Sequence, residues 1–100
     1  MDAMVHLRIF QVNVPIHHTT DKTRNGLHVF TGQAASTCDA VRIAHEVYDA
    51  AVVAQQAGLG IPGRRPDGWG VSGLRPGWEP DWTAARADLW QGRALTRVTL

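Results

Sequence analysis

Histidines at positions 17, 18 and 28 are the ionisable side chains of this chain best suited to chemistry. An imidazole ring takes up or releases a proton near neutral pH and is a common metal ligand. His17 and His18 lie in a polar segment, and His28 follows a turn signal, so the three rings can converge. Neighbouring residues of an extended strand point to opposite faces, however, and no spacing matches a known metal pattern. We therefore expect no metal site, and we keep His17, His18 and His28 as acid–base or ligand-binding candidates.

Two other motifs resemble catalytic or nucleotide-binding sequences only in part. His45-Glu46 begins like the zinc-binding helix motif His-Glu-x-x-His, but Asp49 replaces the second imidazole. The glycine-rich stretch 58–63 follows an expected helix rather than a strand, and it lacks the Gly-Lys-Ser/Thr ending of a phosphate loop. The sequence thus shows no catalytic residues and no cofactor motif. Enzymatic activity stays undecided, and a non-enzyme without a cofactor is favoured.

The most distinctive stretch of the chain combines tryptophan with arginine. Residues 61–90 contain all four tryptophans and four of the five prolines, which prevent a long regular helix or strand there. Tryptophan and arginine are the residue types most enriched at protein-interface hot spots, and tryptophan also stacks on nucleic-acid bases. We call residues 61–78 the Trp/Arg loop. The candidate binding residues in and beside it are Arg64, Arg65, Trp69, Arg75, Trp78 and Trp82.

Composition limits the classes of protein that this chain can belong to. One hundred residues, 44% hydrophobic and 19% charged, fit a single globular domain over residues 1–100. A net charge of +1 argues against a strongly electrostatic nucleic-acid binder. Cys38 has no partner for an intrachain disulfide, which favours a cytoplasmic setting. No secretory signal and no long apolar run are present, so we expect no membrane association.

Alternating apolar residues predict two strands in the first third of the chain. Met4–Val14 is the first predicted strand, and Pro15 is expected to end it because proline lacks a backbone donor. Asn25-Gly26 is a strong two-residue turn signal. The second predicted strand is Leu27–Thr31, which we expect Gly32 to stop.

A long amphipathic helix is the clearest expected element. Ser36 or Thr37 is expected to cap it, it should run from about Thr37 to Ala57, and Gly58 should end it. Its polar positions form a single narrow stripe: Asp39, Arg42, Glu46, Asp49 and Gln56. The remaining apolar arc is wider than one sheet needs, so we expect the sheet to cover one side and the Trp/Arg loop or a partner the other.

A short second helix over Asp81–Gln91 and a weak third strand over Ala94–Leu100 complete the predicted elements. The expected fold is α+β, with a small, mostly antiparallel sheet packed on the long helix.

Three functions remain open. The leading hypothesis is a non-enzymatic binding or regulatory module that contacts another protein through the long helix and the Trp/Arg loop. A second copy of the chain, burying the Ala/Val-rich helix face in a homodimer, is one form of it. A nucleic-acid binder that uses the Trp/Arg loop is the first alternative. The second alternative is a small ligand-binding protein or enzyme, with His17 and His18 as acid–base groups in a pocket that tryptophan side chains cover.

Overall fold

The computed structural model describes residues 7–71 and 73–90. An antiparallel sheet and one long helix make up the fold, so the predicted α+β class is confirmed. The predicted strand at 94–100 lies outside the described residues. In chain order the elements are β1 (Arg8–His18), β2 (Asn25–Ala34), α1 (Thr37–Gln56), β3 (Trp78–Pro80), the 3-10 turn η1 (Trp82–Ala84) and β4 (Arg86–Leu89).

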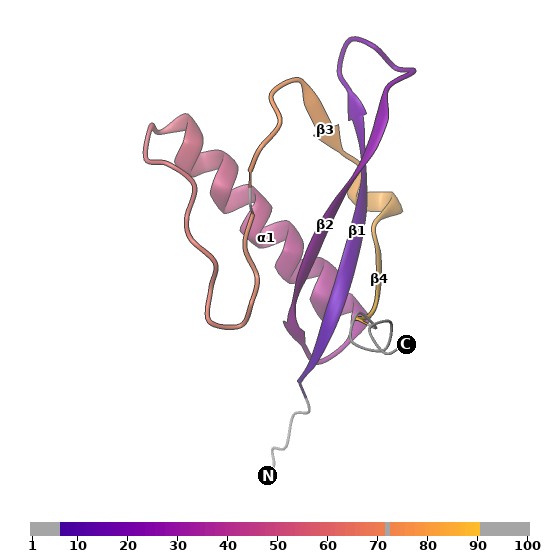
Figure 1. The fold of residues 1–100 in the computed structure, drawn as a ribbon, viewed down its shortest axis with the longest axis vertical. Coiled ribbons are helices and arrows are strands. Elements are labelled where there is room, and N and C mark those ends of the chain that lie inside the picture. The colour runs from indigo at the N-terminus through magenta and orange to yellow at the C-terminus, as the bar shows by residue number, and fades with distance from the viewer. Residues whose placement is uncertain (1–6, 72, 91–100) are drawn as a thin grey trace, which may run out of the picture.

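The sheet is built around β1. All of β1 except His18 pairs with β2, in a register that runs from Arg8 opposite Ala34 to His17 opposite Asn25. The other side of β1 is shared by β3 at one end and β4 at the other. Helix α1 lies across one face of this sheet (Figure 1). β2 therefore forms one edge of the sheet, and the face opposite α1 carries no other element of the described chain.

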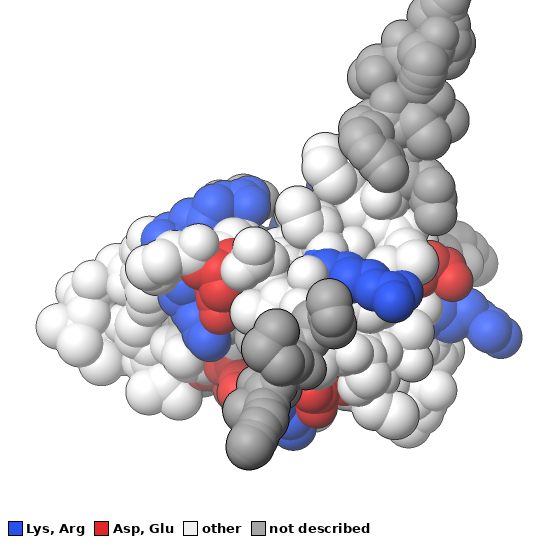
Figure 2. All heavy atoms as spheres, turned by 90° about the horizontal axis from the view of Figure 1, so that it is seen from below, with Lys and Arg blue, Asp and Glu red and all other residues white. Residues whose placement is uncertain are grey.

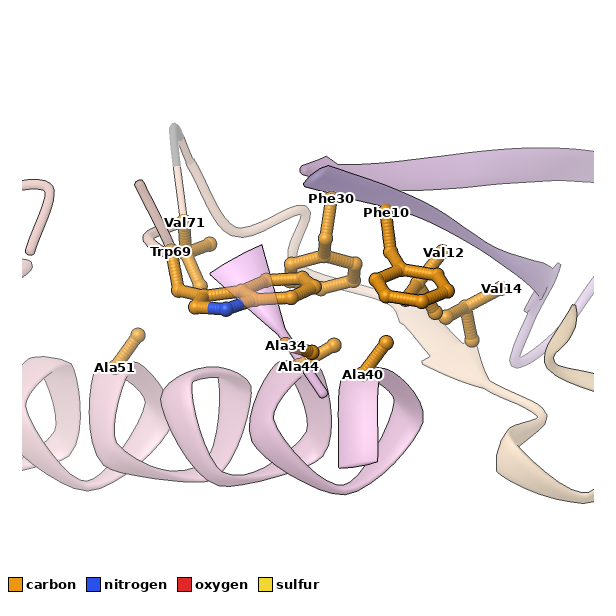
Figure 3. Close-up of a cluster of buried hydrophobic side chains, with 10 residues drawn as sticks. All are labelled: Phe10, Val12, Val14, Phe30, Ala34, Ala40, Ala44, Ala51, Trp69 and Val71. Atoms are coloured by element: carbon orange, nitrogen blue, oxygen red, sulfur yellow. The ribbon is translucent and has the colours of Figure 1, made fainter. Parts of the chain in front are cut away.

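The core lies between the sheet and α1. Alternate residues of β1 point toward the helix, and small alanines on α1 let the two layers approach closely. Trp69 and Val71 of the Trp/Arg loop enter the same cluster beside α1 (Figure 3). The cluster comprises Phe10, Val12, Val14, Phe30, Ala34, Ala40, Ala44, Ala51, Trp69 and Val71.

Helix α1 begins and ends as its sequence predicts. The Ser36 hydroxyl accepts a hydrogen bond from the Asp39 amide at 3.1 Å, which satisfies one of the unpaired donors of the first turn. The helix ends at Gln56, and Gly58 follows with φ of 76°, a conformation that favours glycine. Across residues 7–71 and 73–90, no helix combines the length and the apolar character needed to cross a bilayer.

Pro15 lies inside β1, so the prediction that it ends the first strand is wrong. Its carbonyl accepts a hydrogen bond from the Asp81 amide at 2.8 Å, so its nitrogen also faces the β3–β4 side of the strand. There the chain leaves the sheet through η1 between the two short strands. A missing donor at this point costs no ladder hydrogen bond, and the proline is tolerated.

The chain reverses before Asn25-Gly26, so the predicted turn at that dipeptide is also wrong. Residues 19–24 make the reversal, and Asn25 and Gly26 already belong to β2. The Asp21 carboxylate accepts hydrogen bonds from the Thr23 amide at 3.1 Å and the Thr23 hydroxyl at 2.7 Å. The Arg24 amide closes the turn onto the Asp21 carbonyl at 3.0 Å. Asp21 therefore provides the local turn chemistry.

Gly32 continues the second strand instead of stopping it. β2 extends to Ala34, and Gly32 pairs with Phe10. The indole of Trp69 lies directly against the glycine, because a Cβ atom there would come within 2.3 Å of the ring. Close approach of a side chain from another part of the chain, rather than a break in the strand, explains the glycine.

The predicted second helix is a single 3-10 turn followed by β4. The Asp81 carboxylate accepts from the Thr83 amide at 3.1 Å and caps η1. The chain then extends, and Arg86–Leu89 pairs with residues 13 to 10 of β1. The backbone N–H and C=O groups on this side of β1 need hydrogen-bond partners, and β4 supplies them. This pairing outweighs the helical spacing of apolar residues that predicted a helix here.

Candidate functional site

Trp69 is a core residue that anchors the Trp/Arg loop. Its side chain is fully buried, and its indole N–H donates to the Gln33 carbonyl at 2.7 Å. The backbone on either side is tied down as well: the Gln33 amide donates to the Asp67 carbonyl at 2.9 Å, and the Arg65 amide donates to the Trp69 carbonyl at 2.8 Å. The loop is thus fixed to the end of β2 by an aromatic anchor and several hydrogen bonds.

Arg64 and Arg65 are exposed, and each contacts the loop itself. The Arg64 guanidinium donates to the Gly68 carbonyl at 2.8 Å. The Arg65 guanidinium pairs with the Asp67 carboxylate at 2.8 Å. Exposed ion pairs contribute little to stability, so their main effect is to orient the loop. Their remaining donors stay exposed to solvent.

A pocket opens along the seam between α1 and the Trp/Arg loop. Its volume is about 270 Å³, and four residues of α1 between Glu46 and Ala51 line it together with six loop residues between Pro62 and Val71. The lining is largely apolar, and Glu46 and Arg65 contribute the charged groups. Val53 lies on α1 about one turn beyond the lining residue Ala50, and it is 64% exposed. The seam is therefore both hollowed and bordered by exposed apolar surface.

Trp82 packs against the middle of α1. Its ring stacks on His45 with a centroid distance of 4.2 Å and an interplanar angle of 9°. Tyr48 and Phe30 contact it at 5.9 Å and 5.8 Å between ring centroids. Because η1 carries Trp82 onto the helix, this indole covers part of the apolar arc that the sheet leaves open.

Trp78 and Arg75 form a separate cluster near the turn of the β1–β2 hairpin. The Arg75 guanidinium lies 5.8 Å from the centroid of the Trp78 ring, and that of Arg24 lies 5.5 Å away. These distances allow cation–π attraction. The His18 ring meets the indole edge-on at 5.3 Å. Sequence reasoning missed Arg24, because two pairings bring it to Trp78: the hairpin places Arg24 beside His18, and β3 places Trp78 opposite the same residue.

The three candidate histidines do not share one site. His17 and His18 point to opposite faces of β1, and the Asn25 side chain lies 3.3 Å from the His17 ring. The Nδ1 atom of His18 accepts from the Asp21 amide at 3.1 Å. His28 stacks on Phe30 at 4.5 Å, toward α1. In the described part of the chain, no group of three or more His, Cys, Asp or Glu side chains is placed to hold a metal ion.

His28 should make the stability of the fold depend on pH. Burial lowers the pKa of His28, and the charge of Arg75 lowers it further. The folded protein then binds this proton less readily than the unfolded chain does. The contribution of His28 to stability is full above the unfolded pKa of about 6.5 and is lost as pH falls through the folded pKa. A His28→Phe variant should therefore lose less stability between pH 7 and pH 5 in urea denaturation.

The role of Arg75 in this effect can be measured separately. Arg75→Gln removes a like charge, so the pKa of His28, read from its ring-proton NMR signals, should rise. Arg86→Gln, at an exposed arginine on β4, is the matched control and should leave that pKa unchanged. An unchanged pKa in both variants would contradict the assignment to Arg75.

The candidate tryptophans and arginines lie in three separate places: the seam, the Trp78 cluster and the contact of Trp82 with α1. On the face shown in Figure 2, Lys and Arg side chains are interspersed with Asp and Glu. This face thus presents no continuous basic surface of the kind that a nucleic-acid backbone attracts. Comparisons of this chain with protein-family models, with curated proteins and with solved structures find no match.

Proposed function

We propose that this chain is a non-enzymatic binding module that recognises another protein along the seam between α1 and the Trp/Arg loop. The observation that carries the proposal is the apolar pocket of about 270 Å³ that both elements line. Apolar pockets bordered by exposed apolar surface are typical of interface hot spots, where a partner inserts a large side chain.

The size of the pocket favours a protein side chain over a cofactor. Small-molecule sites usually span about 300–1,000 Å³, so this pocket lies at or below the lower end of that range. Trp69 and the hydrogen bonds around it hold the loop side of the pocket in place. A preformed pocket lowers the entropic cost of binding. The charges of Glu46 and Arg65 supply polar contacts for residues that flank the inserted side chain.

The other two hypotheses receive less support from the geometry. A nucleic-acid site would need several accessible indoles, whereas Trp69 is buried and Trp82 is stacked on His45. An acid–base pair of His17 and His18 would need both rings on one side of β1, and they lie on opposite sides. A homodimer through the Ala/Val-rich face of α1 is not part of the proposal. The sheet packs on that face, where Ala40 and Ala44 belong to the core.

Peptide selection tests the seam directly. A random peptide library displayed on phage is panned on the immobilised protein, and the enriched peptides are measured for binding in solution. We expect them to share one large apolar residue flanked by charged residues. Ala50→Arg, which places a long charged side chain in the pocket lining, should weaken their binding at least tenfold, equivalent to about 1.4 kcal/mol.

Ala57→Arg is the matched control, since Ala57 is exposed at the end of α1 and does not line the pocket. Peptides that bind both variants as well as the unmodified protein would show that recognition lies elsewhere. Circular dichroism of both variants verifies that α1 is intact.

A further inference from the structure

The outer edge of β2 is a second surface suited to recognition, and it is independent of the seam. The His18 amide donates to the Arg24 carbonyl at 3.1 Å, so even-numbered β2 residues direct their backbone groups toward β1. The odd-numbered residues direct theirs away from β1. Gln33 confirms this assignment, because its amide and carbonyl are both bonded to the Trp/Arg loop.

Leu27 and Val29 are the residues of this edge that lie apart from the loop anchor. Among the described residues, their outward N–H and C=O groups have no backbone partner. The two residues are 56% and 48% exposed, and their side chains lie on the sheet face opposite α1. Edge strands are commonly protected by a lysine, a proline or a bulge. Leu27–Gln33 contains neither lysine nor proline, and its pairing with β1 is continuous.

A groove runs beside this edge. Its volume is about 290 Å³, and it lies between Leu27–Val29 of β2 and residues 73–75 of the Trp/Arg loop, with Ile16 also in its lining. An extended peptide that adds to a sheet edge uses this kind of space, because its backbone pairs with the strand while alternate side chains contact the walls. The loop anchor at Gln33 closes one end, so the open length suits a short segment.

The charged side chains around the groove indicate which kind of peptide segment it can bind. Arg75 lines the groove, which has no acidic side chain in its lining. Arg24 lies nearby, because both guanidinium groups contact the same Trp78 ring. Neither arginine forms an ion pair with another described residue. Two arginines without acidic partners attract carboxylates, which they can bind through two parallel hydrogen bonds.

We propose that β2 accepts an extended, acidic segment of a partner protein as an additional strand of the sheet, with an acidic side chain bound by Arg75 and Arg24. Backbone pairing with Leu27 and Val29 provides affinity, and the two arginines provide specificity for negative charge. The site uses no residue of the seam pocket, so it holds or fails separately from the seam.

Titration with three synthetic peptides tests the proposal in the unmodified protein, with backbone amide NMR as the measurement. The first peptide is acetyl-Glu-Val-Glu-Val-Glu-amide, the second replaces glutamate by lysine, and the third is the first with two adjacent central nitrogens methylated. We expect the first peptide to shift the amides of Leu27 and Val29 saturably and to slow their exchange with solvent. The other two should bind at least about tenfold more weakly, since each loses charge-assisted or backbone hydrogen bonds.

Two variants localise the effect within the groove. Val29→Pro removes an outward donor but no hydrogen bond to β1, and it should weaken binding about tenfold. Arg75→Gln should weaken binding about threefold to tenfold, whereas Arg86→Gln should not change it. The indole N–H signal of Trp69 reports whether each variant keeps the native loop anchor.

Several results would overturn the proposal. Equal affinity for the methylated peptide excludes strand addition, and equal affinity for the lysine peptide excludes selection by charge. Shifts at Val47 and Ala50 instead of Leu27 and Val29 would assign the peptide to the seam. Tighter binding of a single-stranded oligothymidylate than of the glutamate peptide, lost in Arg75→Gln, would assign the groove to nucleic acid.

Discussion

Gly32→Ala is expected to lower the free energy of unfolding by about 3 kcal/mol, at the upper end of the usual cost of an overpacked core. A Cβ atom on Gly32 would lie 2.3 Å from two atoms of the Trp69 ring and 2.5 Å from a third. The indole cannot simply move away, because its N–H is bonded to Gln33 and its other contacts are core side chains. Relief therefore requires the Trp/Arg loop to leave its place.

Urea denaturation, followed by circular dichroism, measures this effect. Gly63→Ala is the matched control: a Cβ atom there meets nothing within 4 Å, and the same loop carries it. Its free energy of unfolding should change by no more than about 0.5 kcal/mol. Similar denaturation midpoints for Gly32→Ala and the unmodified protein would show that the indole does not lie against β2 in solution.

Trp69→Ala is expected to cost about 3–5 kcal/mol, a large part of the roughly 5–15 kcal/mol that stabilises a domain of this size. Trp69 is fully buried and is the largest side chain of the core. Its loss leaves a cavity between β2 and α1 and removes the donor bonded to the Gln33 carbonyl. The loop would lose its main attachment, and one wall of the seam pocket would be lost with it.

Differential scanning calorimetry can compare this variant with Trp90→Ala, the control in which an indole that is 43% exposed is removed. The control should cost about 1 kcal/mol or less. A cycle that combines Trp69→Ala with Gly32→Ala adds a sharper criterion. Once the indole is gone, Gly32→Ala should cost little, so the two effects should be non-additive by at least about 1 kcal/mol. Additive effects would contradict direct contact between the two residues.

These expectations bear on both proposals in different ways. A loosened loop should weaken peptides selected for the seam, because Trp69 lines that pocket. Binding at the β2 edge depends on Leu27 and Val29, whose strand stays paired with β1, and on Arg75, which the same loop carries, so Trp69→Ala should weaken it as well. Ala50→Arg alters the seam pocket and no residue of the β2-edge groove, so comparing both kinds of peptide on that variant would separate the two sites.

Local sequence signals were sufficient for α1 and for the fold class. The Ser36 cap, the stop at Gly58 and the single polar stripe act within a few residues of one another, so no distant contact is needed to read them. The alternation of apolar residues in β1 likewise predicted a strand but did not decide which side is buried. Its first apolar residues, Leu7 and Ile9, are exposed, whereas Phe10, Val12 and Val14 are buried. The α+β class follows from these elements and from their order along the chain.

The candidate site could be predicted only in outline. The richness of the Trp/Arg loop in tryptophan and arginine was visible in the sequence, but the role of each side chain was not. Trp69 enters the core, Trp82 stacks on α1, and Trp78 joins two arginines. Arg24 was overlooked, because its neighbours come from residues about fifty positions away.

The sequence alone determined the long capped helix, the strand character of β1 and the mixed fold class, because short-range hydrogen bonding and side-chain periodicity specify them. Tertiary structure alone decided the points where local preference is weak or misleading. β1 continues through Pro15 because η1, and not a paired strand, lies beside the proline nitrogen, which has no hydrogen to donate. β2 continues through Gly32 because the Trp69 indole packs directly against this residue and leaves no room for a side chain. Residues 86–89 form a strand because β1 leaves backbone groups that need partners. In each case the arrangement of segments distant in sequence decides what the local preference leaves open or predicts wrongly.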